Sequence, residues 1–151
     1  MPIVSRQQWL EQRLALLEKE KELTRLRDEL SEQRRALPWV EVTKNYQFID
    51  VDRAKSLLDL FGERGQLLVY HFMYGPHWET GCKSCSFWAD NYNGVDVHLA
   101  NRDITLLAVS NAPIATLQAF KERMGWSFQW VSTSTSEFSQ DYGVTFGEQE
   151  K

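Results

Sequence analysis

The two cysteines of the chain, Cys82 and Cys85, are the side chains best suited to covalent chemistry. Thiols separated by two residues can form a disulfide, exchange it with another disulfide or bind a metal ion. The pair follows an apolar run, 67–73, and precedes a segment, 83–100, whose composition predicts a helix. Because backbone N–H groups at a helix N-terminus stabilise an anion, a thiolate at Cys82 would form at a lower pH than a free thiol. Cys85, one turn further along, is placed to attack a mixed disulfide on Cys82.

Charged and metal-binding groups lie near the pair in the sequence. Lys83 adds a positive charge, and His77 could hydrogen-bond to the Cys82 sulfur or support it electrostatically. The alternative is that His77 is a surface loop residue. Cys82, Cys85 and His77 also form an incomplete set of zinc ligands, but their spacing to His98 matches no common zinc-finger pattern. We therefore favour redox chemistry that uses no metal or other cofactor.

Polar and aromatic residues around the pair each allow two interpretations. The Thr80 hydroxyl could donate to the Cys82 sulfur or to a bound peroxide; alternatively it caps the helix while Pro76 shapes the turn before it. Trp78 and Trp88 could form an apolar rim for a partner. Core packing is the more common place for large aromatic side chains, and we expect it here.

The elements that position the cysteines alternate between strand and helix. The apolar runs 67–73 and 104–109 predict strands buried on both faces, and 126–131 predicts a shorter one. Helices are predicted over 83–100, with a break at Gly94, and over 113–124. This order implies parallel βαβ units. Before them, alternating apolar residues in 40–43 and 46–49 predict a hairpin that turns at Lys44-Asn45, and 53–61 predicts a short helix or turn.

The N-terminal segment predicts one long helix over 5–36, capped by Ser5. Its apolar residues recur every seven positions, whereas the intervening core positions are mostly polar; the repeat consists of Trp9, Leu16, Leu23, Leu30 and Leu37. The helix is either a coiled-coil dimerisation arm or an amphipathic helix that lies on its own domain. We expect two parts, a helical arm over 1–37 and an α/β domain over 38–151.

The composition limits the function further. Of 151 residues, 42% are hydrophobic and 13% aromatic, enough for a real core, and the net charge of −4 argues against nucleic-acid binding. No apolar run is long enough to span a membrane, and the N-terminus lacks the apolar region of a signal peptide. Two closely spaced cysteines do not make a disulfide scaffold. We expect a cytoplasmic protein without a membrane partner.

The residues around the cysteines resemble a bacterial family of thioredoxin-like proteins of unknown function, whose members are predicted dithiol–disulfide oxidoreductases. The resemblance rests on 67–76, on Gly81-Cys82-x-x-Cys85-Ser86 and on further matches across 35–146. A more distant similarity to peroxiredoxins lies in the spacing of Pro76 and Thr80, although Cys82 follows Thr80 by two residues rather than three. The resemblance implies a thioredoxin-like sheet, parallel or mixed, with flanking helices. It also implies Cys82 as nucleophile, Cys85 as resolving thiol, a protein disulfide or peroxide as substrate and an external thiol as reductant.

The sequence departs from a complete thioredoxin fold at its C-terminal end. Only about twenty residues follow Val131, and no proline follows Pro113, so the usual last hairpin and the loop proline that faces the cysteines have no counterpart. A shortened sheet would expose an edge and a face, which predicts a homo-oligomer. Two hypotheses follow: a dithiol–disulfide oxidoreductase or peroxiredoxin-like reductase, and a non-catalytic oligomeric interaction module with an inert or metal-binding CxxC.

Overall fold

The computed structural model describes residues 2–145. The chain separates into two compact units, Met1–Thr43 and Lys44–Lys151. The first unit contains one helix, and the second contains a sheet with helices packed against it.

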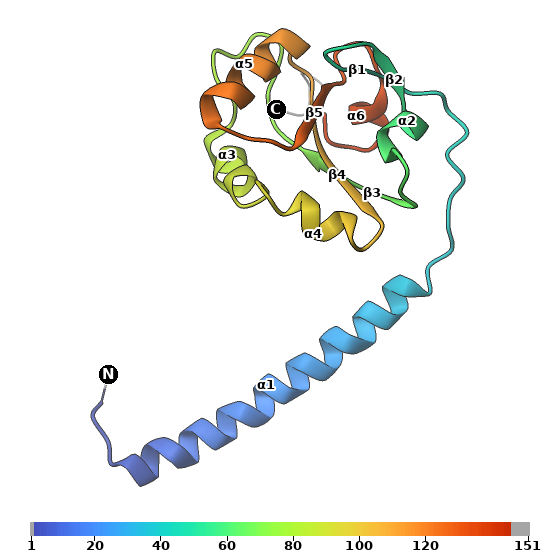
Figure 1. The fold of residues 1–151 in the computed structure, drawn as a ribbon. Helices are drawn as coiled ribbons and strands as arrows, with labels where there is room; N and C mark the ends of the chain where they lie inside the picture. Colours follow the sequence, from blue (N-terminus) through green and yellow to red (C-terminus); the bar gives the residue numbers. More distant parts are fainter. Residues whose placement is uncertain (1, 146–151) are drawn as a thin grey trace. The chain divides into compact units, whose positions relative to one another are not determined.

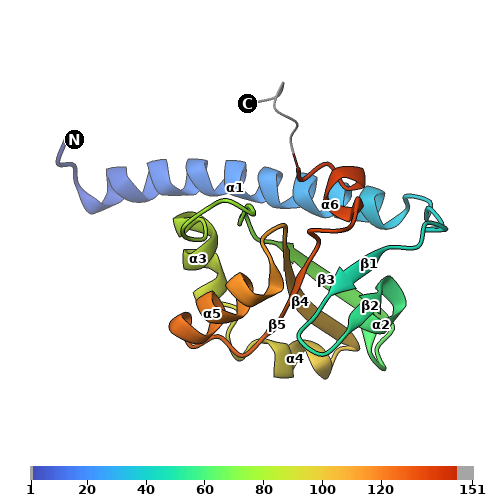
Figure 2. The same cartoon turned by 90° about the horizontal axis from the view of Figure 1, so that it is seen from above.

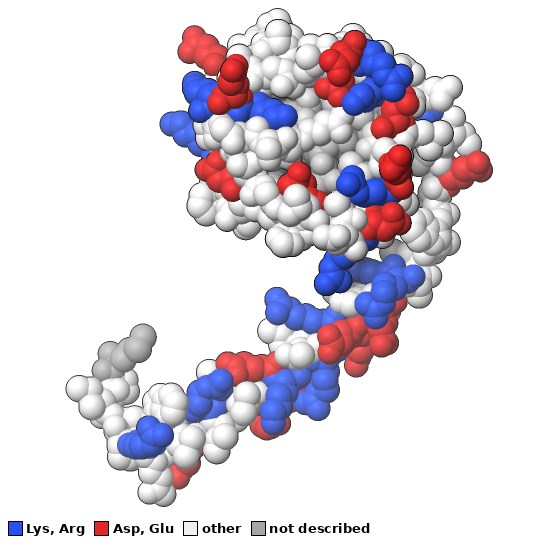
Figure 3. Space-filling view, viewed as in Figure 1, with Lys and Arg blue, Asp and Glu red and all other residues white. Residues whose placement is uncertain are grey.

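Helix α1 (Arg6–Arg35) confirms the long N-terminal helix. Ser5 caps it: the Ser5 hydroxyl accepts a hydrogen bond from the Gln8 N–H at 3.3 Å, and the Gln8 side chain accepts one from the Ser5 N–H at 3.1 Å. Acidic and basic side chains alternate along its surface (Figure 3). No residue of α1 is buried, and the apolar side chains of the seven-residue repeat stay about half exposed. The apolar stripe therefore has no partner within its own unit.

The second unit is built on a five-stranded mixed sheet in the order β2-β1-β5-β4-β3 (Figure 1). Strands β3, β4 and β5 are parallel, and β1 pairs antiparallel with both β2 and β5. The parallel βαβ units expected from the sequence are therefore present. The strands are β1 (Gln47–Ile49), β2 (Ala54–Ser56), β3 (Gln66–His71), β4 (Ile104–Ser110) and β5 (Gln129–Ser132).

Helices cover both faces of this sheet (Figures 1 and 2). They are α2 (Leu57–Phe61), α3 (Lys83–Asp90), α4 (Asp96–Ala100), α5 (Ile114–Met124) and α6 (Phe138–Asp141). The break at Gly94 is confirmed, because this residue takes a positive φ of 84° between α3 and α4. Gly125 likewise ends α5 in the left-handed conformation.

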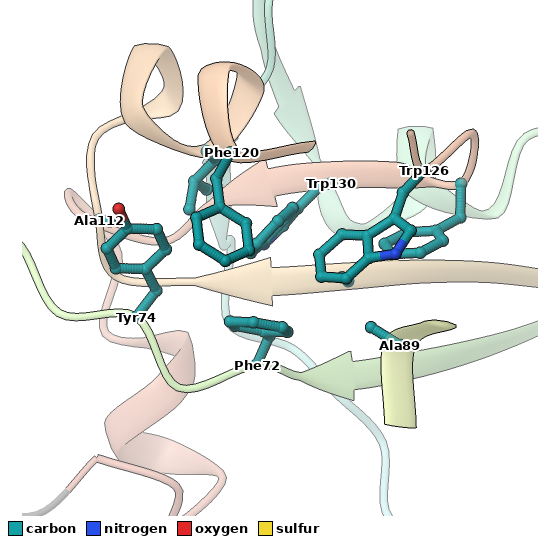
Figure 4. Packing of buried hydrophobic residues seen from close by; sticks show 10 residues of the cluster. Phe72, Tyr74, Ala89, Ala112, Phe120, Trp126 and Trp130 are labelled. Atoms are coloured by element: carbon teal, nitrogen blue, oxygen red, sulfur yellow. The ribbon is translucent and has the colours of Figure 1, made fainter. Parts of the chain in front are cut away.

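Alternation along the central strand β4 builds two apolar cores. Ala108 faces a cluster of aromatic rings under α3 and α5, while Leu107 and Val109 face a second cluster under α2 and α6. The first cluster contains Phe72, Tyr74, Phe120, Trp126, Phe128 and Trp130 (Figure 4). The second contains Tyr46, Phe48, Leu60, Val131 and Phe138. The expectation of an uncovered face is therefore wrong, because α2 and α6 bury that side of the sheet.

Two local predictions are also wrong. Strand β1 pairs with β2, which follows it, whereas 40–43 form no strand and Val40 is 86% exposed. β3 is not buried on both faces, because it forms an edge of the sheet and its Leu68 is 49% exposed. Among residues 2–145 no strand follows β5, which agrees with the expected shortened sheet.

Candidate functional site

The loop between β3 and α3 closes on itself so that its two ends lie together. At its start, the Phe72 N–H donates to the Val109 carbonyl at 2.9 Å, and the Ser110 hydroxyl donates to the Phe72 carbonyl at 2.7 Å. At its end, the Cys82 N–H donates to the Met73 carbonyl at 3.1 Å. These bonds hold Cys82 beside the carboxyl end of β3.

Gly81 allows the loop to approach the core closely enough for this placement. A Cβ at this position would lie 2.8 Å from Cε1 of Phe72 and 3.2 Å from Cζ of Phe120. Both rings are buried in the aromatic cluster, so neither can move away easily. Only glycine therefore fits directly before Cys82.

Cys82 is the N-cap residue of α3. Its sulfur accepts a hydrogen bond from the Cys85 N–H at 3.4 Å, within the range for sulfur acceptors. This bond is the largest cause of a pKa below the ordinary value for a thiol; the Cys85 thiol and the Ser84 backbone N–H lower the pKa of Cys82 further, against a smaller opposing effect of burial. The helix N-terminus therefore favours the thiolate form of Cys82, as predicted from the sequence.

Cys85 has the opposite electrostatic environment. It is partly buried against the aromatic cluster, and this burial raises the pKa of its thiol above the ordinary value. The Tyr70 hydroxyl donates to the Cys85 carbonyl at 3.1 Å and fixes the first turn of α3 to β3. Burial raises the pKa of Tyr70 as well, so its hydroxyl remains a donor. Both cysteines are free thiols.

The arrangement can perform two thiol reactions in sequence. Because the thiolate is the reactive form of a cysteine, the more acidic and more accessible sulfur reacts first. Here that sulfur belongs to Cys82, which accepts the hydrogen bond of the Cys85 backbone N–H at 3.4 Å. Cys85 lies in the first turn of the helix that Cys82 caps.

None of the predicted supporting residues hydrogen-bonds to a cysteine sulfur within residues 2–145. His77, Thr80 and Lys83 are all exposed, and none of their side chains hydrogen-bonds to another residue in the described part of the chain. Thr80 is not the helix cap, because the Cys82 sulfur occupies that role. Within residues 2–145 no three metal-ligating side chains cluster, so His77 does not complete a metal site with the cysteines.

The tryptophans near the cysteines are not core residues. Trp78 is 46% exposed and rests against Gly75, where a Cβ would lie 2.8 Å from its Nε1. Trp88 is 57% exposed and packs edge-on to the ring of Phe87, which is also exposed. The expectation of core packing is wrong at both positions, because the aromatic cluster is already filled by Phe72, Phe120 and the residues around them.

Tyr70 is the positioning residue that the sequence reasoning missed. It lies within the apolar run that predicted a strand, and only its hydroxyl distinguishes it from its neighbours. A partly buried tyrosine requires a hydrogen-bond partner, and this requirement is the signal in the sequence that points to a role next to the CxxC helix.

The fold is that of the thioredoxin-like proteins, and the chain belongs to a known bacterial family. Residues 1–151 match the family described as "Bacterial protein of unknown function (DUF899)", which confirms the resemblance. None of the curated proteins matches the chain.

Two examples of solved structures with this fold come from Xylella fastidiosa and Bacteroides vulgatus. One is a cysteine-to-serine mutant of PrxQ from Xylella fastidiosa, with 18% identity and a TM-score of 0.54 over 74% of this chain. The alignment spans 65% of that PrxQ chain, so this chain corresponds to less than two thirds of its length. The other is described as a "putative thiol-disulfide oxidoreductase" from Bacteroides vulgatus, with 15% identity and a TM-score of 0.50 over 69% of this chain and 70% of that one. At these identities the likeness establishes the α/β fold with its mixed sheet and flanking helices.

None of the helices within residues 2–145 is both long and apolar enough to cross a bilayer.

Proposed function

We propose that this protein is a thiol–disulfide oxidoreductase in which Cys82 is the nucleophile and Cys85 the resolving thiol. The observation that carries the proposal is the position of the Cys82 sulfur at the N-terminus of α3, where it accepts a hydrogen bond from the Cys85 N–H at 3.4 Å. The amide of Cys85 at the N-terminus of α3 lowers the pKa of Cys82, and burial raises the pKa of Cys85. The thioredoxin-like fold places a CxxC at this same junction of strand and helix, which supports the assignment.

The reaction follows from which sulfur is ionised. The Cys82 thiolate attacks one sulfur of a substrate disulfide; the substrate S–S bond breaks, and the departing sulfur leaves as a thiolate that takes a proton from water. Cys85 then loses its proton and attacks the Cys82 sulfur, which forms a Cys82–Cys85 disulfide and releases the second substrate thiol. An external dithiol reduces this disulfide and returns both sulfurs to the starting state.

We propose a disulfide rather than a peroxide as the oxidising substrate. A hydroxyl that activates a bound peroxide would have to lie at the sulfur, and Thr80 makes no hydrogen bond to Cys82. The exposed positions of His77, Thr80, Lys83 and Trp78 favour contact with an incoming substrate over support of the thiolate. A reducing compartment such as the cytoplasm, where a dithiol reductant is available, fits this cycle.

We also propose that α1 is a separate assembly arm that joins copies of the chain, with residues 1–37 as arm and 38–151 as redox domain. A single helix with a half-exposed apolar stripe is stable in water when the stripe packs against a partner. Light scattering of the full chain is expected to give an oligomer that Leu23→Glu dissociates. A wild-type monomer would remove the arm's assembly role and leave the redox proposal standing.

The redox proposal is tested by insulin reduction with dithiothreitol as the reductant. The wild type is expected to accelerate precipitation, Cys82→Ser to abolish the acceleration, and Cys85→Ser to accumulate a mixed disulfide on Cys82 that mass spectrometry detects. Thr135→Ala, which removes an exposed hydroxyl outside the site, serves as the matched control. Equal rates for the wild type and Cys82→Ser would favour the rival hypothesis of a non-catalytic interaction module.

A further inference from the structure

A surface groove of about 530 Å³ lies beside the CxxC loop, between this loop and α5. Its floor includes Phe120, whose Cζ lies 3.2 Å from the position a Cβ would take at Gly81, directly before Cys82. The groove therefore lies beside the loop residue that precedes Cys82, while Cys82 itself is not among its lining residues. Its volume falls in the range of about 300–1,000 Å³ that is typical of sites for small molecules.

Small residues on α5 create this groove. Ala115 and Ala119 are one helical turn apart and both line it, so the helix presents a gap where larger side chains would form a ridge. The rings of Phe120 and Tyr74 lie beneath, with centroids 5.5 Å apart (Figure 4). The result is an apolar floor that a short aliphatic chain can contact.

Two opposite charges line the same groove. Glu79 enters from the CxxC loop and Arg123 from the last turn of α5. The Arg123 guanidinium lies 4.5 Å from the centroid of the Phe120 ring, which holds it over the groove floor. Neither Glu79 nor Arg123 forms an ion pair with another residue of the described chain. The groove thus offers one free carboxylate and one free guanidinium.

We propose that this groove binds a small disulfide that carries both an ammonium and a carboxylate group, as the disulfide of a free amino acid does. Arg123 is suited to a bidentate contact with the carboxylate, and Glu79 to the ammonium, while the aliphatic part lies on Phe120. The inference rests on the proposed redox function and names its substrate class. Bound in this way, the ligand presents its S–S bond to the Cys82 thiolate.

The reaction is the exchange already described, with a small disulfide as the oxidant. The Cys82–ligand bond forms as the ligand S–S bond breaks, and the first amino-acid thiol leaves after it gains a proton. Cys85 displaces the second thiol, and two electrons from an external dithiol restore the cysteines. Each cycle therefore yields two amino-acid thiols per disulfide consumed.

The test compares cystine with the neutral bis(2-hydroxyethyl) disulfide as oxidants of the reduced full-length protein. Stopped-flow absorbance at 240 nm follows loss of the thiolate in wild type, Arg123→Gln, Glu79→Gln and Ala119→Leu. Glu122→Gln and Arg102→Gln are matched controls, because they remove exposed charges that do not line the groove.

Arg123→Gln and Glu79→Gln are each expected to lower the rate of oxidation by cystine about tenfold, since a lost charge-assisted contact has roughly this effect. The rate of oxidation by the neutral disulfide is expected to stay within about twofold of the wild-type rate. Ala119→Leu, which fills the groove, is expected to slow cystine at least as much.

Unchanged cystine rates in all three groove variants, with the neutral disulfide still reactive, would overturn the inference and leave the redox function intact. The inference is also overturned if the variants lower only the rate of reaction with a protein disulfide such as that of insulin. If neither small disulfide oxidises Cys82 in the wild type, the inference is overturned, and the redox function fails with it where insulin reduction is also absent.

Discussion

The close approach at Gly81 leads to a prediction about how the loop holds Cys82. In Gly81→Ala, the new Cβ would lie 2.8 Å from Cε1 of Phe72, about 0.7 Å short of the ordinary contact distance of roughly 3.5 Å. The Phe72 ring cannot easily withdraw, because it packs against two other rings. Its centroid lies 4.7 Å from the centroid of the Trp130 ring and 5.9 Å from that of the Trp126 ring. Overpacking of this kind lowers the free energy of unfolding by about 1–3 kcal/mol.

Gly75→Ala is a matched control in the same loop. Its Cβ would lie 2.8 Å from the indole of Trp78, but this side chain is half exposed and can swing outward. The free energy of unfolding is therefore expected to change by less than about 1 kcal/mol. Urea unfolding measures the free energy of unfolding of both variants. Alkylation of Cys82 by iodoacetamide at pH 7 is expected to be slower than in the wild type for Gly81→Ala alone. Equal effects of the two substitutions would refute the claim that the core rings position Cys82.

Two further predictions concern the buried Ser110 hydroxyl and the partly buried Asp50 carboxylate. Ser110→Ala removes the donor to the Phe72 carbonyl and the acceptor of the Trp130 indole N–H at 3.0 Å. Because both groups are then left unpaired, the free energy of unfolding should fall by about 2–4 kcal/mol. A fall of less than about 1 kcal/mol in urea unfolding would contradict this prediction. Burial raises the pKa of Asp50, but the Lys55 ammonium at 2.7 Å and other hydrogen bonds outweigh it and lower the pKa below its usual value. Because the folded-state pKa is depressed, the stability that the carboxylate contributes is present above about pH 4 and is lost as pH falls through the folded pKa. The stability difference between the wild type and Asp50→Asn should therefore shrink on acidification, and a constant difference from pH 6 to pH 2.5 would contradict the assignment.

The strands and helices that hold the cysteines were predictable because their periodicity is strong. The β3–α3–β4–α5–β5 order and the break at Gly94 follow from runs whose apolar spacing fits one element each. The capping of α3 by Cys82, and with it the direction of the pKa shift, follows from the position of the CxxC after a strand.

The errors arose where distant contacts decide the structure. The alternation in 40–43 fits a strand, yet β1 pairs with β2, because Tyr46 and Phe48 must bury against Phe138, some ninety residues later. Position within a sheet is likewise invisible in an apolar run, so β3 could not be recognised as an edge strand. The exposure of Trp78 depends on which other aromatic rings already fill the core.

The groove beside Cys82 also lay beyond prediction from sequence. Its walls come from the loop before α3 and from one face of α5, and nothing in the spacing of Glu79 and Arg123 indicates that they line one hollow. Phe120 of α5 packs against the loop at Tyr74 and Gly81, which brings the two segments together.

The central claim is that the N-terminus of α3 lowers the pKa of Cys82 while burial raises the pKa of Cys85. The most direct measurement is the pH dependence of iodoacetamide alkylation at each cysteine of the reduced wild type, resolved by mass spectrometry of the peptides. The pKa of Cys82 is predicted to lie below that of an ordinary thiol and the pKa of Cys85 above it. Equal values for the two cysteines, or a lower value for Cys85, would contradict the account.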